Sequence, residues 1–92
     1  MRESQLERRL VREVERIGGI APKWVSPGNN GVPDRIVILP GGRTLYVEMK
    51  APGKQLEPLQ AHWARKLLGM GHRHYKIDSD EDIDRFIDEV RT

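Results

Sequence analysis

The sequence contains no cysteine. Disulfide bonds, thiolate metal sites and cysteine nucleophiles are therefore excluded as sources of stability or chemistry. No apolar run approaches the roughly 20 residues that span a bilayer. The first residues, Met1 to Gln5, are not followed by an apolar core, so we expect neither a membrane helix nor a secretory signal. These absences favour a cytoplasmic protein.

Aromatic residues and an excess of one charge are also scarce. The chain has two Trp, two Tyr and one Phe, and its net charge is only +2 although 33% of its residues are charged. It is therefore not a polybasic arm, and any nucleic-acid surface must be a local patch. With 92 residues and 37% apolar content, we expect a single domain over residues 1–92. Its core is modest, which makes a homodimer plausible.

Hydrophobic periodicity predicts six elements in the order helix, strand, strand, helix, strand, helix. This order predicts an α/β fold in which helices flank a small mixed sheet with an antiparallel hairpin. The near-continuous apolar run of the first strand predicts burial on both of its faces, and Leu59, Trp63 and Leu67 are predicted to line the inner face of the second helix. The expected elements are residues 2–17, 34–39, 44–50, 58–68, 72–77 and a last helix capped by Ser79.

Two acids and a lysine lie at the ends of the two predicted hairpin strands. Asp34 begins the first strand, and Glu48 and Lys50 close the second. Because the turn at residues 40–43 folds one strand back along the other, these three residues should meet at one end of the sheet. Two carboxylates bind a hard divalent cation, and a nearby lysine can activate water or stabilise an anion. The set is suited to metal-assisted phosphodiester hydrolysis, although a surface ion pair is the simpler alternative.

An acid also falls on the apolar face of the first predicted helix. At about 100° per residue, Glu7 lies between Leu10 and Val11, and Glu3 projects nearby one turn earlier. A carboxylate on a buried face is costly unless it is paired or binds a metal. The alternative is that Glu7 lies at the rim of the stripe and reaches water or an arginine.

Several other residues allow both a functional and an ordinary interpretation. Lys23 and Trp24 are suited to contact a nucleic-acid backbone and a base or sugar, but packing is favoured for Trp24. His72 and His74 share a strand face and suit zinc, but with no further ligand nearby a solvated basic edge is favoured. Gln60 borders the stripe of the second helix and can hydrogen-bond a site residue or a nucleotide, with a solvated side chain as the default.

Taken together, these motifs resemble the PD-(D/E)XK nuclease superfamily and, over nearly the whole chain, its VRR-NUC family of virus-type replication-repair nucleases. Acid-x-Lys alone is a weak motif, but the ordered arrangement is specific. One departure is Glu57-Pro58, where a Ser-Pro or similar cap is expected. The residues that carry the resemblance are Gly18-Gly19, Lys23, Gly31-Val32-Pro33-Asp34-Arg35, Val47-Glu48-Met49-Lys50-Ala51-Pro52-Gly53, Gln60 and Gly71.

The resemblance implies a restriction-endonuclease-like core and Mg²⁺- or Mn²⁺-dependent cleavage of DNA. Asp34, Glu48 and the backbone carbonyl of Met49 would be metal ligands, with Glu7 as the acid from the first helix, or Glu3 if the helix register differs. Lys50 would orient the attacking water. Gln60 would match a family glutamine. Candidate DNA-backbone contacts are Lys23, Arg35, Lys54, Arg65 and Arg73.

Small members of this family resemble Holliday junction resolvases, which implies a homodimer that acts on branched DNA in a bacterial or phage-infected cell, or on its nucleoid. Two rival interpretations stay open. One is a nucleic-acid-binding module of the same fold without turnover. The other is a small structural or dimerisation domain whose charges are only solvated, which predicts no metal-dependent thermal shift.

Overall fold

The computed structural model describes residues 2–91 and has the predicted order of elements. Helix α1 spans Glu3–Arg16, and the hairpin strands β1 and β2 span Arg35–Leu39 and Arg43–Met49. Helix α2 spans Pro58–Gly69, strand β3 spans His74–Ile77 and helix α3 spans Asp80–Val90. The predicted α/β fold is confirmed.

The sheet has the strand order β1-β2-β3. Strands β1 and β2 are antiparallel with Arg35 opposite Val47, and β2 and β3 are parallel with Tyr46 opposite His74. The hairpin turn uses Gly41 and Gly42, whose φ angles of 83° and 74° are in a region that glycine adopts without strain. Strand β3 begins two residues later than predicted.

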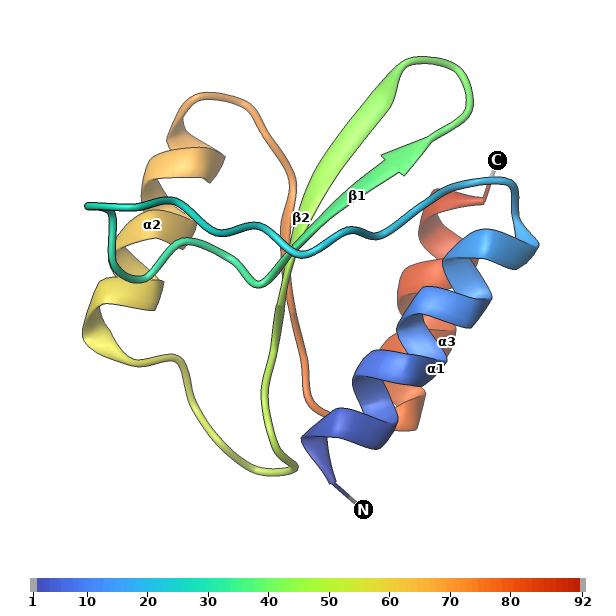
Figure 1. Ribbon diagram of the computed structural model, residues 1–92, viewed down its shortest axis with the longest axis horizontal. Coiled ribbons are helices and arrows are strands. Elements are labelled where there is room, and N and C mark those ends of the chain that lie inside the picture. The colour runs from blue at the N-terminus through green and yellow to red at the C-terminus, as the bar shows by residue number, and fades with distance from the viewer. Residues whose placement is uncertain (1, 92) are drawn as a thin grey trace.

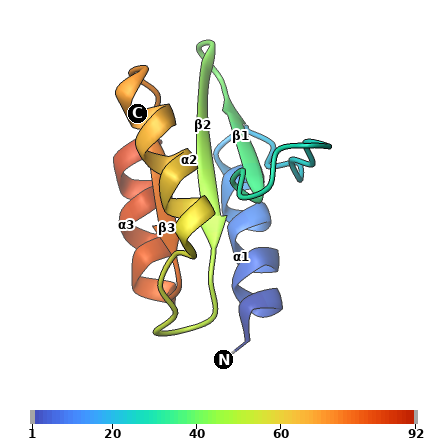
Figure 2. The same cartoon turned by 90° about the vertical axis from the view of Figure 1, so that its left-hand side faces the viewer.

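Three layers result, with α2 on one face of the sheet and α1 and α3 on the other (Figure 1). Turning the molecule shows α1 and α3 behind the strands and the hairpin extending beyond the helices (Figure 2). Alternation along β2 sends Leu45, Val47 and Met49 into the core with α1 and α3. The opposite face of the same strand carries Tyr46 and Glu48 toward α2.

The α2 face is the less apolar of the two and is covered only in part. The buried side chains of α2 are Ala64 and Leu67, whereas Leu59 is 53% exposed. On β1, Val37 is buried but Ile38 is 41% exposed. The predictions of a β1 buried on both faces and of an inward Leu59 are therefore wrong, because one short helix covers only part of this face.

Loop residues 20–32 bring the chain across the edge of β1. Isolated bridges join Ile20 to Ile38 and Lys23 to Arg35, so this segment lies alongside β1. Gly31 has φ +93°, and a Cβ there would lie 2.7 Å from the backbone of Leu59. A glycine is therefore required where the loop passes α2 and delivers Asp34 to the sheet. Within residues 2–91, no helix is long and apolar enough to cross a membrane.

Candidate active site

The hairpin brings Asp34 and Glu48 together at one end of the sheet. Asp34 directly precedes β1, and its Oδ2 accepts a hydrogen bond of 3.0 Å from the backbone N–H of Met49. This bond extends the β1–β2 hydrogen bonding beyond the Arg35–Val47 pair, with a side chain in place of a backbone carbonyl. The convergence expected from the hairpin connection is present in the structure.

Glu48 is the one buried charged residue of the described chain, with 2% of its surface exposed. Its Oε2 accepts a hydrogen bond of 2.8 Å from Gln60 Nε2, whereas its Oε1 is buried without a hydrogen-bond partner. Burial, followed by the adjacent charge of Asp34, raises the pKa of Glu48 from 4.5 to about 8. An ionised carboxylate here is costly unless a cation compensates for it.

The pKa of Asp34 is raised as well, and burial is again the main cause. Burial raises its pKa, and the negative charge of Glu7 acts in the same direction, while the Met49 N–H opposes both. The negative charge of Asp34 contributes to the raised pKa of Glu48, so the two carboxylates interact electrostatically. Such a pair titrates as a unit, and it holds a proton that a divalent cation would displace.

Gln60 links the lysine to the carboxylates. Its Nε2 donates to Glu48, while its Oε1 accepts from Lys50 Nζ at 3.3 Å and from the backbone N–H of Glu57 at 2.8 Å. The last bond satisfies a free donor at the start of α2, so one amide both caps the helix and orients two site residues. Gln60 is thus not the solvated glutamine of the default interpretation. The departure at Glu57-Pro58 leaves the start of α2 intact.

Glu7 lies near this group but is held by Arg35. Its Oε1 accepts from Arg35 Nη2 at 3.0 Å and from Nε at 3.3 Å, and the two side chains are 21% and 14% exposed. The alternative stated for Glu7, a rim position beside an arginine, describes this arrangement. Within residues 2–91, no three His, Cys, Asp or Glu side chains gather closely enough to hold one metal ion. Glu7, or Glu3 one turn earlier, stays a predicted ligand.

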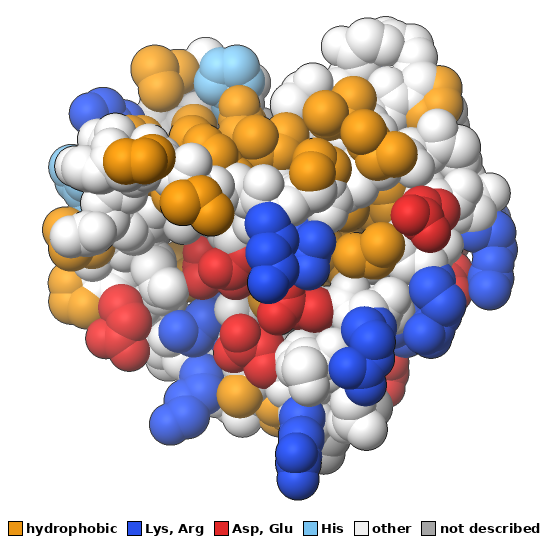
Figure 3. Space-filling view, viewed as in Figure 1, with side chains coloured by type: hydrophobic (Ala, Val, Ile, Leu, Met, Phe, Trp, Pro, Cys, Tyr) orange, Lys and Arg blue, Asp and Glu red, His pale blue; other side chains and the backbone are white. Residues whose placement is uncertain are grey.

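The residues predicted to contact DNA differ in their surroundings. The exposed ones are Lys23, Lys54, Arg65 and Arg73. Arg35 is instead engaged within the protein, since its Nη1 also donates to the carbonyl of Ala21 at 2.9 Å. Figure 3 shows acidic and basic side chains gathered below a band of hydrophobic ones on the face that contains the 20–32 loop. Arg35 thus positions Glu7 and the loop, and its contact with DNA stays a prediction.

The donor set fits a hard divalent cation. Asp34 and Glu48 offer carboxylate oxygens, and the Oε1 of Glu48 is free of hydrogen bonds. Mg²⁺ and Mn²⁺ prefer oxygen ligands and are commonly held by one or two carboxylates. A bound cation would pair the buried negative charge and return the pKa of Glu48 toward its ordinary range.

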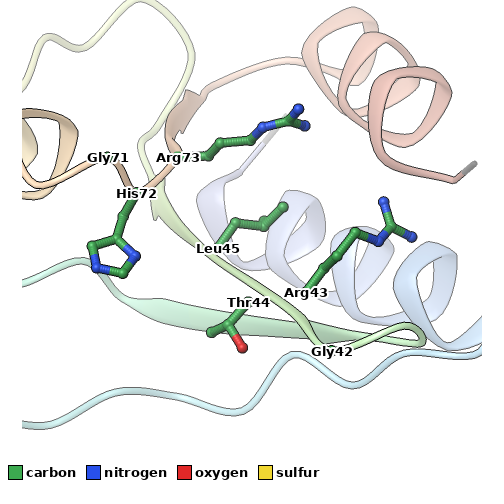
Figure 4. Close-up of a pocket in the computed structure, with 7 residues that line it drawn as sticks. All are labelled: Gly42, Arg43, Thr44, Leu45, Gly71, His72 and Arg73. Carbon is green, nitrogen blue, oxygen red and sulfur yellow. The ribbon is translucent and has the colours of Figure 1, made fainter.

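A separate cavity of about 340 Å³ lies at the opposite end of β2. Figure 4 shows Arg43 and Arg73 on the side of Leu45, and Thr44 and His72 pointing to the other side. Arg43 is anchored there, because its Nη1 donates to the carbonyl of Val90 at 2.6 Å. This cavity is not part of the carboxylate site.

No protein-family model matches the chain. Comparison with curated proteins finds "Putative nuclease p44" of Acyrthosiphon pisum secondary endosymbiont phage 1, which is 48% identical over 81 residues and matches 88% of this chain and 87% of the relative. Among solved structures, a "VRR_NUC domain" superposes with a TM-score of 0.90 and 26% identity over 96% of both chains. The chain belongs to the VRR-NUC family.

In this VRR-NUC chain, sequence reasoning found the residues that meet at the site but missed how they are held. From periodicity alone, a solvated Gln60 was the default prediction, yet its amide joins Glu48, Lys50 and the start of α2. A signal for this was available, because Gln60 occupies the third position of a helix that begins at a proline, where a glutamine commonly bonds back to the cap. The Glu7–Arg35 pair, 28 residues apart, gives no local signal.

Proposed function

We propose that this VRR-NUC nuclease is a divalent-metal-dependent DNA endonuclease. The observation that carries the proposal is the buried Asp34–Glu48 pair, whose Glu48 Oε1 lacks a partner and whose pKa values are raised. Asp34, Glu48 and the Met49 carbonyl are the proposed ligands of Mg²⁺ or Mn²⁺, with Glu7 as a further acid. The bound ion would lower the pKa of a water molecule and neutralise phosphate oxygens.

The chain's own residues position and assist the reaction. Lys50, oriented by Gln60, can stabilise the developing negative charge at the phosphorus or polarise the attacking water. Once ionised, Asp34 and Glu48 are negatively charged, so they attract a cation and repel a phosphate. Substrate affinity must therefore come from exposed cations elsewhere on the surface, which we propose are Lys23, Lys54, Arg65 and Arg73.

We propose further that the enzyme acts as a homodimer on branched DNA. Two sites related by a two-fold axis can cut two strands of a junction symmetrically. The exposed hydrophobic side chains of Ile20, Val25 and Ile38 support a partner surface. Sedimentation velocity at assay concentrations tests this, and a monomer that cuts junctions with full activity would refute the dimer.

The decisive experiment compares cleavage of linear, flapped and four-way DNA with and without Mg²⁺. Lys50→Ala is expected to bind DNA with unchanged affinity and to lose cleavage by roughly 100-fold or more, the usual effect of removing a charge-stabilising group. Lys54→Ala is the matched control. This lysine lies in the following loop, so the change should weaken binding slightly and leave cleavage of saturated enzyme intact. Binding by the wild-type chain without cleavage under any metal would instead support the non-catalytic module.

A further inference from the structure

Four rings gather on the α2 face of the sheet, and we refer to Trp24, Tyr46, Trp63 and His72 as the aromatic cluster. The Trp24 ring centroid lies 5.5 Å from that of Tyr46 and 6.4 Å from that of Trp63, and Tyr46 lies 5.9 Å from His72. None of the four belongs to the main hydrophobic core. Trp24, Tyr46 and Trp63 stay partly exposed and His72 is exposed, so the cluster has ring surface available to a ligand.

The packing favoured for Trp24 from the sequence is present, but it leaves this group at the surface. In contrast, Phe86 is 2% exposed and belongs to the main core, and the partly buried Tyr75 packs against it. A chain with two tryptophans in all therefore places both in the cluster at the molecular surface. Large, partly exposed aromatic side chains are typical of binding surfaces.

The cluster adjoins the carboxylate site along two elements. On β2, Tyr46 lies two residues before Glu48 on the same face, a distance of about 7 Å along the strand. On α2, Trp63 follows Gln60 by three residues, which places the two side chains on neighbouring turns. A DNA strand with a phosphate at the carboxylates can therefore reach the rings with a base that is about one nucleotide away.

Cations border these rings. Lys66 Nζ lies 5.2 Å from the centre of the Trp63 ring, and the exposed Lys23 precedes Trp24 in the chain. Aromatic faces interleaved with positive charge suit a strand of bases and phosphates better than an apolar protein surface.

We propose that the aromatic cluster is a stacking platform for unpaired nucleobases. This rests on the proposed DNA cleavage and specifies its substrate class, namely DNA with a single-stranded segment beside the scissile phosphate. Bases in a duplex already stack on one another, so only unpaired ones can occupy the rings. Because every base has a π-face, the platform selects single-stranded structure and is tolerant of sequence.

The two tryptophans make the test direct, since both belong to the cluster and selectively excited tryptophan fluorescence therefore reports only on it. In metal-free buffer, which separates binding from cleavage, a single-stranded oligothymidylate is titrated into the wild-type protein beside a blunt duplex of equal length. We expect saturable quenching with the single strand and much weaker quenching with the duplex. Equal quenching by both, or none with either, would overturn the platform.

Substitutions at Trp63 separate stacking from packing. Trp63→Leu keeps an apolar side chain but removes the π-face, and we expect single-strand affinity to fall on the order of tenfold. Trp63→Phe should stay within about twofold of wild type. Leu68→Ala is the matched control, since it removes another partly exposed apolar side chain of α2. Single-strand affinity of Trp63→Leu equal to that of wild type would refute the proposal.

The remaining outcomes also discriminate. Fluorescence that changes with protein concentration alone, together with an altered dimer equilibrium in Trp63→Leu, would show that the cluster binds a second copy of the chain and would overturn the platform. Quenching by single strands in a chain that never cuts DNA would preserve the platform and refute the proposed cleavage. Cleavage of junctions without any fluorescence quenching by single strands would support the proposed cleavage and overturn the platform.

Discussion

The buried carboxylate of Glu48 should destabilise the metal-free protein as the pH rises. Its pKa is 4.5 ordinarily and about 8 in the fold, so the native state holds a proton that the unfolded chain has lost between these values. The free energy of unfolding therefore decreases as the pH increases through this window. At about 1.4 kcal/mol per pH unit, the loss between pH 5 and pH 8 is on the order of a few kcal/mol.

Glu48→Gln removes this pH-dependent loss of stability while keeping the shape of the side chain. The amide can still accept the hydrogen bond from Gln60 Nε2, and it carries no charge at any of these pH values. We expect the variant to match wild type near pH 5 and to be more stable by a few kcal/mol at pH 8. For a domain of this size, that corresponds to a higher melting temperature by on the order of 10 °C. The same variant should not cleave DNA.

Thermal and urea unfolding followed by circular dichroism in chelator at pH 5, 6, 7 and 8 measure this difference. Other groups titrate in the same range, including His74, whose pKa burial lowers and whose effect has the opposite sign. These effects largely cancel in the difference between variant and wild type. Glu15→Gln, which removes an exposed carboxylate on α1, is the control and should stay within about 0.5 kcal/mol. Parallel pH profiles for Glu48→Gln and wild type would refute the reasoning.

Three further outcomes are expected. Mg²⁺ should raise the melting temperature of wild type more at pH 8 than at pH 6, because it displaces a proton, and should not shift Glu48→Gln; equal shifts would contradict this. Gln60→Ala should reduce turnover more than DNA affinity in cleavage and binding assays, since it frees Lys50 and Glu48. Gly31→Ala should lower stability in urea by about 1–3 kcal/mol through strain and its contact with Leu59, whereas Gly28→Ala, which meets no neighbour, should lower it less.

The fold was predictable because each element carries a local signal. The apolar stripe of α1, the Gly41-Gly42 turn and the Ser79 cap each determine a boundary from nearby residues, and the cap is present, with Ser79 Oγ accepting from the Asp82 N–H at 3.1 Å. The exposure of Ile38 was not predictable, because it depends on how much of the sheet α2 covers. A strand's own composition does not contain that information.

In the candidate site, the meeting of the two carboxylates was predictable, whereas the partner of Glu7 was not. Asp34 and Glu48 meet because a hairpin constrains them, and a hairpin is local. The partner of Glu7 is Arg35, which packing chooses among several arginines in the chain, so periodicity alone left two interpretations open. The predicted roles of the site residues in cleavage await the assays above.

The triple role of the Gln60 side chain has a consequence for how the molecule responds to its surroundings. Helix α2 buries few side chains, so its first turn depends on an amide that also contacts a titratable group. A change in the charge of Glu48 should then alter the hydrogen bond of the Glu57 backbone N–H. Hydrogen exchange at that single backbone position would then report whether the carboxylate site is protonated, ionised or bound to a metal ion.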